Sequence, residues 1–266
     1  MAARTPPITL TTDFGTTDPF VGIMKGVILG ISPETTIVDI THEIPAQDVS
    51  AAAFHLGNAW RHFPRGTVHV AVVDTGVGSS RRALALSAGD HFFVGPDNGL
   101  LTPIFNEVSW RAVEITAAHY LDPSPSPTFH GRDVFAPAAA HLAKGTALEN
   151  FGEPLSNPVR IDLSPPVVEG ATIRARIVHV DRFGNLVLNV EGAHLARAAS
   201  GDSPRALTGE VAGRKIDLFV THYAAAKGSL CFLVNSDGCL EVALPGGSAA
   251  ATLGVGRGDE ILVRVG

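Results

Sequence analysis

Two segments of the sequence carry the residue types that acid–base chemistry needs. Asp74 ends a run of apolar residues, Arg81 follows it seven residues later, and His130 stands far downstream beside a glycine. A carboxylate can accept a proton, a guanidinium keeps a neighbouring carboxylate ionised, and an imidazole changes protonation near neutral pH. If the fold brings them together, these three side chains could orient and activate a water molecule.

Each of these residues also has an ordinary structural interpretation. Asp74 and Asp13 both end a strand pattern and have a glycine two residues later, where an aspartate often caps a helix or forms a turn. The glycines and arginines after Asp74 could bind a phosphate, but their spacing matches neither the P-loop nor the dinucleotide fingerprint. His130 could be a surface or packing residue, and Asp133 could cap the following helix. Single motifs leave both interpretations open.

The elements around these residues predict an α/β domain. Strand patterns alternate with helical patterns, the strands at 8–13, 36–40, 68–73 and 91–94 and the helices at 22–31, 49–63 and 133–142. This alternation predicts a mainly parallel sheet with helices on both faces. Ligands of such sheets bind beyond the carboxyl ends of the strands, which is where Asp13 and Asp74 stand.

The second half of the chain has a different pattern. Between 145 and 170 the sequence is rich in Pro, Asn, Ser and Gly, which is typical of a linker. Short strand patterns separated by turn residues follow at 172–180, 186–190, 208–211, 215–220, 230–234, 239–244 and 260–265. They predict a carboxy-terminal all-β, barrel-like domain. We therefore expect an amino-terminal α/β domain over 1–160 and a β-barrel domain over 168–266.

Composition and charge narrow the function classes. The chain has 266 residues, 45% of them hydrophobic, which is enough to bury the cores of two domains. Its net charge is −6 and no run of Lys or Arg could follow a phosphate backbone, so we expect no nucleic-acid partner. No stretch approaches the ~18 apolar residues of a spanning helix, and the start of the chain lacks the apolar core of a signal peptide. No membrane association is expected.

These observations predict a soluble, cytoplasmic protein without a cofactor. The two cysteines, Cys231 and Cys239, indicate neither a disulfide framework nor a zinc site. A weaker alternative is an oxygen-rich metal site, for which the sequence offers Asp13, Asp97, His130 and Asp133. Their spacing is not that of a metal-ligand motif, so we expect no metal.

Six motifs together resemble those of one family, from about residue 8 to 265. In order they are Thr12-Asp13-Phe14-Gly15, the segment 74–82, Pro96-Asp97-Asn98-Gly99, Phe129-His130-Gly131-Arg132-Asp133, Asp181-Arg182-Phe183-Gly184-Asn185 and Asn235-Ser236. The sequence is identified as a member of the S-adenosyl-L-methionine (SAM) hydroxide adenosyltransferases, once called a domain of unknown function and related to the fluorinase and chlorinase. The resemblance implies the two-domain fold and a homotrimer with active sites at subunit interfaces.

The resemblance also implies roles for individual residues. Hydrolases of the family use an Asp, Arg and His set that falls here on Asp74, Arg81 and His130. The related halogenases lack the Asp and the first Arg of this set. The implied substrate-binding residues are Asp13 for the ribose hydroxyls, Asp181 and Ser236 for the methionine amino and carboxylate groups, Asn185 for the purine edge, and Ser248 and Ala249 for adenine.

The expected activity is the hydrolysis of SAM to adenosine and L-methionine through attack of water or hydroxide at C5′. The sulfonium already provides a good, neutral leaving group, so the main requirement is one aligned water. Either Asp74 or His130 could be the base, and both assignments stay open. Two other functions also stay open, a SAM-dependent halide transferase of the same fold and a non-catalytic protein that binds SAM or adenosine.

Overall fold

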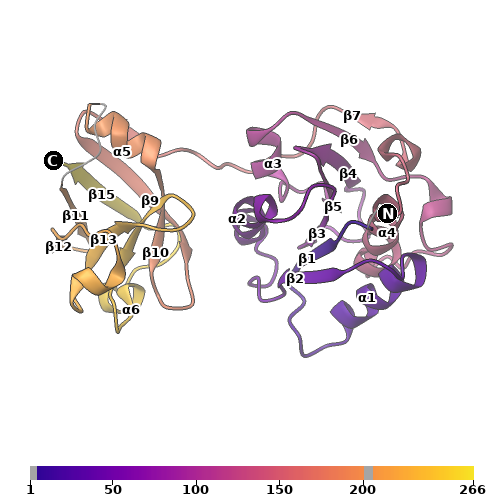
Figure 1. The fold of residues 1–266 in the computed structure, drawn as a ribbon, viewed down its shortest axis with the longest axis horizontal. Helices are drawn as coiled ribbons and strands as arrows, with labels where there is room; N and C mark the ends of the chain where they lie inside the picture. Colours follow the sequence, from indigo (N-terminus) through magenta and orange to yellow (C-terminus); the bar gives the residue numbers. More distant parts are fainter. Residues whose placement is uncertain (1–4, 201–205) are drawn as a thin grey trace. The chain divides into compact units, whose positions relative to one another are not determined.

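The computed structural model describes residues 5–200 and 206–266, which fall into two compact units, one before and one after the link between Asp162 and Leu163. Each unit has its own sheet and its own hydrophobic core. Figure 1 shows the first unit in indigo and magenta and the second in orange and yellow. The fold class predicted from the sequence, an α/β domain followed by a barrel-like all-β domain, is confirmed.

The sheet of the first unit has seven strands in the order β2-β1-β3-β5-β4-β6-β7. These are β1 (Ile8–Thr12), β2 (Ile37–Thr41), β3 (Val68–Val72), β4 (Ala83–Ala88), β5 (His91–Pro96), β6 (Trp110–Glu114) and β7 (Pro154–Leu155). Neighbours among β2, β1, β3 and β5 run parallel, whereas β4, β6 and β7 extend the sheet with antiparallel pairs. The sheet is therefore mixed, and the predicted strands make up its parallel part.

Helices cover both faces of this sheet, as the alternating pattern predicts (Figure 1). They are α1 (Phe20–Ile31) and α4 (Ala136–Ala143) on one face and α2 (Val49–Ala59) and α3 (Thr102–Glu107) on the other, with short 3-10 turns at η1 (Trp60–His62), η2 (Ala118–Tyr120) and η4 (Leu148–Phe151). Met24 and Ile28 of α1 are fully buried because a spacing of four places both on the face towards the sheet.

The helix predicted over 133–142 consists of two different segments. A π-helical turn, η3 (Gly131–Phe135), precedes α4. Pro137 has no N–H for the carbonyl of Asp133, and this carbonyl instead accepts a hydrogen bond from Asp122 N at 3.0 Å. The expected helix cap at Asp133 is wrong, because His130 holds the N-cap position and the buried Asp133 carboxylate accepts from Ser126 N at 2.8 Å.

The second unit contains an antiparallel sheet in the order β12-β11-β15-β9-β10-β14-β13, with β8 paired to β9. Its elements are β8 (Val167–Glu169), β9 (Thr172–Val180), β10 (Leu186–Glu191), α5 (Gly192–Ala198), β11 (Leu207–Val211), β12 (Arg214–Ile216), η5 (Tyr223–Ala226), β13 (Cys231–Val234), β14 (Cys239–Ala243), α6 (Ala249–Leu253) and β15 (Glu260–Val265). A bridge between Phe219 and Phe232 connects the chain after β12 to β13, so the sheet nearly closes. Each strand pattern predicted in this region contains a strand.

Among the described residues, no helix combines the length and the apolar character needed to cross a membrane.

Candidate active site

Asp13 and Asp74 follow neighbouring parallel strands at the same edge of the first sheet. Thr12, the end of β1, pairs in register with Val72, the end of β3. Neither aspartate caps a helix, since the N-cap residue of α1, the helix after Asp13, is Pro19, and that of α3, the helix after Asp74, is Leu101. Asp13 Oδ2 instead accepts a hydrogen bond from Gln47 N at 2.8 Å. The helix-cap interpretation of these residues is therefore wrong.

Asp74, Arg81 and His130 form one contiguous cluster. Arg81 Nε donates to Asp74 Oδ1 at 2.9 Å, and Arg81 Nη2 lies 2.5 Å from Asp74 Oδ2 and 2.6 Å from His130 Nδ1. The side chains of Asp74 and Arg81 are 6% and 10% exposed. Bidentate pairing of this kind is strong and directional. The structure thus brings together the three residues that the sequence predicts to act together.

The cluster defines the protonation state of His130. A guanidinium can only donate hydrogen bonds, so Nδ1 of His130 accepts and the ring proton lies on Nε2. Burial lowers the pKa of His130, and the positive charge of Arg81 lowers it further, although Asp74 and Asp133 act in the opposite direction. His130 therefore presents an N–H donor from a neutral ring.

Glycine at position 78 allows the loops that carry these residues to meet. Gly78 has φ 76°, and a Cβ there would lie 2.3 Å from the carbonyl oxygen of Pro127, three residues before His130. Any other residue would push the two loops apart. Two further contacts support the cluster, because Asn98 Nδ2 donates to Val73 O at 2.8 Å and the guanidinium carbon of Arg81 lies 5.3 Å from the ring centre of Phe135.

The carboxylates of the metal-site alternative are engaged elsewhere. Asp97 accepts hydrogen bonds from Arg82 Nε and Val159 N, both at 2.8 Å. Asp133 is paired with Arg132. Within residues 5–200 and 206–266, no group of three or more His, Cys, Asp or Glu side chains is arranged to hold a metal ion.

In the second unit, Asp181 and Asn185 form the turn between β9 and β10. Asp181 accepts hydrogen bonds from Phe183 N at 2.9 Å and from the backbone and side-chain nitrogens of Asn185 at 2.8 Å each. A Cβ at Gly184, where φ is 81°, would lie 2.0 Å from Ser248 Oγ. This turn therefore packs directly against the start of α6, which brings Asp181 and Asn185 near Ser248 and Ala249.

Ser236 lies in the exposed turn between β13 and β14. Beside it, sequence reasoning missed Glu241, which is 2% exposed and accepts hydrogen bonds from Tyr223 Oη at 2.9 Å and Asn235 Nδ2 at 3.4 Å. Burial raises the pKa of Glu241, and burial together with this contact raises the pKa of Tyr223 to about 12. A glutamate inside the apolar run of β14 was the available sequence signal.

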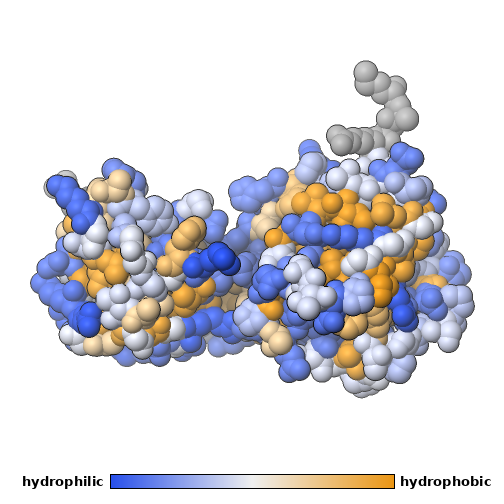
Figure 2. All heavy atoms as spheres, turned by 90° about the horizontal axis from the view of Figure 1, so that it is seen from below, coloured by the Kyte–Doolittle hydropathy of each residue, from blue (hydrophilic) through white to orange (hydrophobic). Residues whose placement is uncertain are grey.

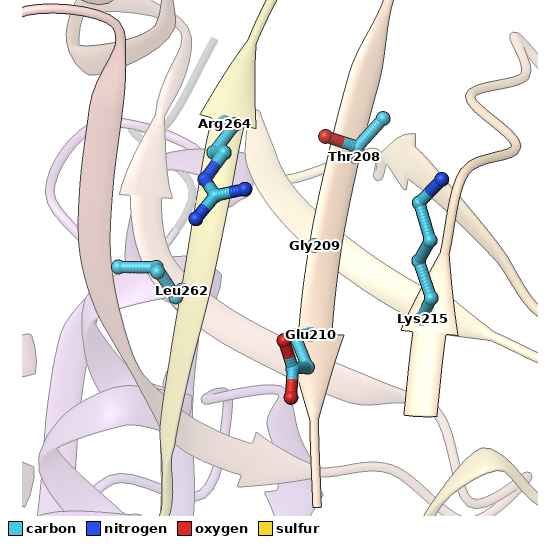
Figure 3. Close-up of a pocket in the computed structure, with 6 residues that line it drawn as sticks. All are labelled: Thr208, Gly209, Glu210, Lys215, Leu262 and Arg264. Atoms are coloured by element: carbon cyan, nitrogen blue, oxygen red, sulfur yellow. The ribbon is translucent and has the colours of Figure 1, made fainter. Parts of the chain in front are cut away.

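A shallow depression lies on the outer face of β11, β12 and β15 (Figure 3). It is lined by Thr208, Gly209, Glu210, Lys215, Leu262 and Arg264. Gly209 faces the core residue Phe232, so the alternating neighbours Thr208 and Glu210 point outward. Glu210 and Lys215 are register partners on neighbouring strands. This depression contains none of the predicted site residues.

The fold and the site define a class of protein: an α/β domain joined to a β-barrel domain, with a carboxylate, a guanidinium and an imidazole in contact beyond the ends of parallel strands. The sequence matches the SAM hydroxide adenosyltransferase N-terminal domain over residues 8–152 and the corresponding C-terminal domain over residues 175–262. The chain belongs to the SAM hydroxide adenosyltransferase family.

Relatives are similar to this chain along almost its whole length. A protein of Salinispora arenicola named (R)-S-adenosyl-L-methionine hydrolase is 41% identical, with 99% of this chain and 100% of the relative covered. A fluorinase of Nocardia brasiliensis is 28% identical, with 99% and 98% covered. The crystal structure of an uncharacterized conserved protein from Thermotoga maritima superposes with a TM-score of 0.90 at 36% identity, covering 97% of this chain and 99% of the other.

Proposed function

We propose that this chain hydrolyses SAM to adenosine and L-methionine by attack of water at C5′ of the ribose. The observation that carries the proposal is the direct contact of Asp74, Arg81 and His130 beyond β3 in a chain of this family. Relatives named as SAM hydrolases, at 35% to 41% identity, support the same reaction.

The reaction depends more on aligning the water with C5′ than on activating the water. The C5′–S bond breaks with both electrons passing to sulfur, which becomes the neutral thioether of methionine. The C5′–O bond forms, and the attacking water loses one proton. Holding water and C5′ in line contributes on the order of 7–11 kcal/mol in favourable cases. A rigid cluster at the end of a strand is suited to this task.

The hydrogen bonds of Arg81 divide the roles within the cluster. Since Arg81 occupies Nδ1 of His130, the Nε2–H of the imidazole can hold the water oxygen but cannot accept its proton. The carboxylate of Asp74 has lone pairs beyond the two that Arg81 uses. We therefore assign Asp74 as the proton acceptor and His130 as the group that orients the water.

The substrate-binding roles are proposed in the same way. Asp13 is assigned to the ribose hydroxyls, and its position beside Asp74 at one edge of the sheet supports this. In the second unit, Asp181 and Ser236 are assigned to the methionine amino and carboxylate groups, and Asn185, Ser248 and Ala249 to the adenine. The contact between the 181–185 turn and the start of α6 supports a shared site for the adenine residues.

We also propose a homotrimer with active sites at subunit interfaces. Helix α1 supports an interface because Phe20, Ile23 and Leu29 are 41%, 37% and 44% exposed. Figure 2 shows apolar side chains gathered on this side of the first unit. Cβ atoms added at Gly22, Gly26 and Gly30 of α1 would meet nothing within 4 Å, so another chain could approach closely. Analytical ultracentrifugation should show a trimer, and a monomer at micromolar concentration would contradict it.

The proposal extends to the cellular setting. Two cysteines without a disulfide support a cytoplasmic location. The net charge of −6, with no basic run, supports the absence of a nucleic-acid partner. Adding DNA or RNA in a gel-shift assay should leave the mobility of the protein unchanged.

The function is tested by product analysis with purified protein and SAM, in halide-free buffer and with chloride or fluoride added. Adenosine and methionine should form without halide. Asp74→Asn should lower kcat about 10²- to 10⁴-fold because it removes the proton acceptor. Asp90→Asn, which makes the same chemical change in an exposed Asp–Arg pair, is the control and should leave kcat unchanged.

Two outcomes would contradict the hydrolase. Formation of 5′-halo-5′-deoxyadenosine only when halide is present would indicate a halide transferase, as the fluorinase relatives suggest. Tight binding of SAM with no turnover after long incubation would indicate a non-catalytic binding protein.

A further inference from the structure

A chain of buried side chains supports the loop that carries Asp13. The hydroxyl of Thr12, the last residue of β1, lies 2.8 Å from Nδ1 of His42. The same hydroxyl oxygen accepts a hydrogen bond from Phe14 N at 3.2 Å. The oxygen thus accepts from the loop while its own hydrogen is donated to the imidazole. Through its hydroxyl, Thr12 is bound to His42 on one side and to Phe14 on the other, so the chain is fixed both before and after Asp13.

The second ring nitrogen of His42, Nε2, lies beside the carboxylate of Asp39. His42 Nε2 lies 3.1 Å from Asp39 Oδ1, although its N–H does not point directly at an acceptor, so the contact is mainly electrostatic. Lys25 donates to the second oxygen of Asp39 at 2.6 Å. Burial raises the pKa of Asp39, but the contacts with Lys25 and His42 outweigh burial and hold this pKa below its usual value. An ionised Asp39 favours the tautomer with the proton on Nε2, which leaves Nδ1 to accept from Thr12.

The loops after β1 and β2 are also joined directly. Gly15 N donates to the carbonyl of His42 at 2.8 Å, and Gln47 N donates to the carboxylate of Asp13 at 2.8 Å. Gln47 is held at φ 65°, a left-handed conformation that residues other than glycine rarely adopt. Such strain persists only where the surroundings over-determine it. The direction of the Asp13 carboxylate therefore depends on the loop that begins at His42.

We propose that Thr12 and His42 are positioning residues that set the orientation of the Asp13 carboxylate and thereby the affinity for the vicinal hydroxyls of the nucleoside. The inference rests on the proposed function only through the assignment of Asp13 to the ribose. Thr12 is 0% and His42 5% exposed, so they act through the loop rather than by touching substrate. A carboxylate that accepts from two hydroxyls needs a fixed direction, because these bonds weaken steeply with angle.

Strand β1 contains a matched control for this pair. The hydroxyl of Thr9 also lies 2.8 Å from Nδ1 of a histidine, His69, and both residues are fully buried. Replacing either threonine by valine removes one buried hydroxyl–imidazole hydrogen bond and hardly changes the volume. Thr12→Val also removes the hydrogen bond from Phe14 N, so its melting temperature should fall at least as far as that of Thr9→Val. Only Thr12 is adjacent to Asp13.

The experiment compares binding of adenosine and 2′,3′-dideoxyadenosine to the full chain by calorimetry. In Thr12→Val, the ratio of the two affinities should fall about tenfold, because a well-directed hydrogen bond to a charged group is lost. In Thr9→Val the ratio should stay within about twofold of the wild type. Thr12→Ser keeps the hydroxyl and should restore the ratio. With SAM as substrate, Thr12→Val should raise KM much more than it lowers kcat.

The outcomes separate this role from general stability and from the proposed reaction. An unchanged ratio in Thr12→Val, an equal fall in Thr9→Val, or a wild type that does not prefer adenosine would overturn the inference. If Thr12→Val fails to fold, Asp39→Asn on the partly exposed strand β2 replaces it and should lower the same ratio by a smaller factor; an unchanged ratio there overturns the inference too. If SAM is not hydrolysed but the ratio responds as stated, the proposed reaction is wrong and the positioning role stands.

Discussion

Two buried carboxylates, one in each unit, have opposite electrostatic surroundings. Both oxygens of Asp74 are bound by the guanidinium of Arg81, and the pair is almost completely shielded from water. Glu241 is also buried, but its oxygens accept from the neutral hydroxyl of Tyr223 and the neutral amide of Asn235. Burial therefore raises the pKa of Glu241, and these hydrogen bonds offset the rise in part.

The difference shows what a counter-charge contributes at a buried position. A compensated carboxylate can remain anionic and directional in a dry site, which suits the handling of a proton during catalysis. A carboxylate whose pKa is raised by burial, such as Glu241, makes stability fall as the pH rises through that pKa. Removing the compensation at Asp74 should therefore affect stability at neutral pH, whereas replacing Glu241 should change the shape of the pH profile.

The largest effect is expected from Arg81→Met, which removes the compensation at Asp74. Breaking a buried ion pair by removing one partner costs about 3–5 kcal/mol of unfolding free energy. Chemical denaturation at pH 7.5 measures this loss. The control is Arg65→Met in the exposed pair with Asp90, where less than about 1 kcal/mol should be lost. Asp74→Asn combined with Arg81→Met should recover part of the loss, and equal losses in the single and double variants would contradict the argument.

The next largest effect is the pH dependence of stability that comes from His69, a buried histidine in the same unit as Asp74. Burial lowers the pKa of His69 to about 3, with a smaller contribution from His91. The unfolded chain binds this proton near pH 6.5, so between pH 6.5 and 3 the unfolded state holds more protons than the folded state. Stability should be intact above pH 6.5 and fall by about 1.4 kcal/mol per unit as the pH is lowered further.

Denaturation from pH 7.5 to 4.5 measures this slope. The double variant Thr9→Val/His69→Phe removes the titrating ring together with the hydroxyl bound to it. It also removes the partner of His91 Nδ1, which lies 3.2 Å from His69 Nε2, so the comparison uses the slope with pH and not the absolute stability. Its profile should be flatter than that of the wild type by one proton. An unchanged slope would show that His69 is not the group responsible.

The smallest effect is expected from Glu241→Gln. A raised pKa means that the folded state keeps the proton where the unfolded state has lost it, so this contribution is present below pH 4.5 and is lost as the pH rises through the folded-state value. The stability of Glu241→Gln relative to wild type should therefore improve with pH. Loss of the weak bond from Asn235 should cost about 1 kcal/mol or less at low pH. A difference between Glu241→Gln and wild type that stays the same at every pH would contradict this expectation.

Local patterns predicted much of the fold because the determining residues are close in sequence. The strands of the second unit follow from short alternating runs between turn residues, and each run contains a strand. Strand β4 was missed because its sequence, Ala-Leu-Ala-Leu-Ser-Ala, is no better suited to a strand than to a helix. Its turn residues Gly89 and Asp90, at φ 55° and 65°, are typical of a two-residue hairpin and could have indicated it.

The sequence predicted some residues of the site and missed others. The contact of Asp74 and Arg81 was expected from the resemblance, and the six residues between them are enough to return one side chain to the other. The roles of His42 and Glu241 could not be inferred, because their partners Thr12 and Tyr223 are 30 and 18 residues away. One histidine among eleven carries no local pattern that distinguishes it. Such contacts depend on strand register, which the sequence alone did not define.

The most direct test of the central claim is hydrolysis of SAM in halide-free water enriched in oxygen-18, followed by mass spectrometry of the nucleoside. Adenosine should carry the label at its 5′ oxygen, and this product should be lost in Asp74→Asn and His130→Ala. Unlabelled adenosine, or SAM recovered intact from wild-type protein that binds it, would contradict the claim that this cluster directs water to C5′.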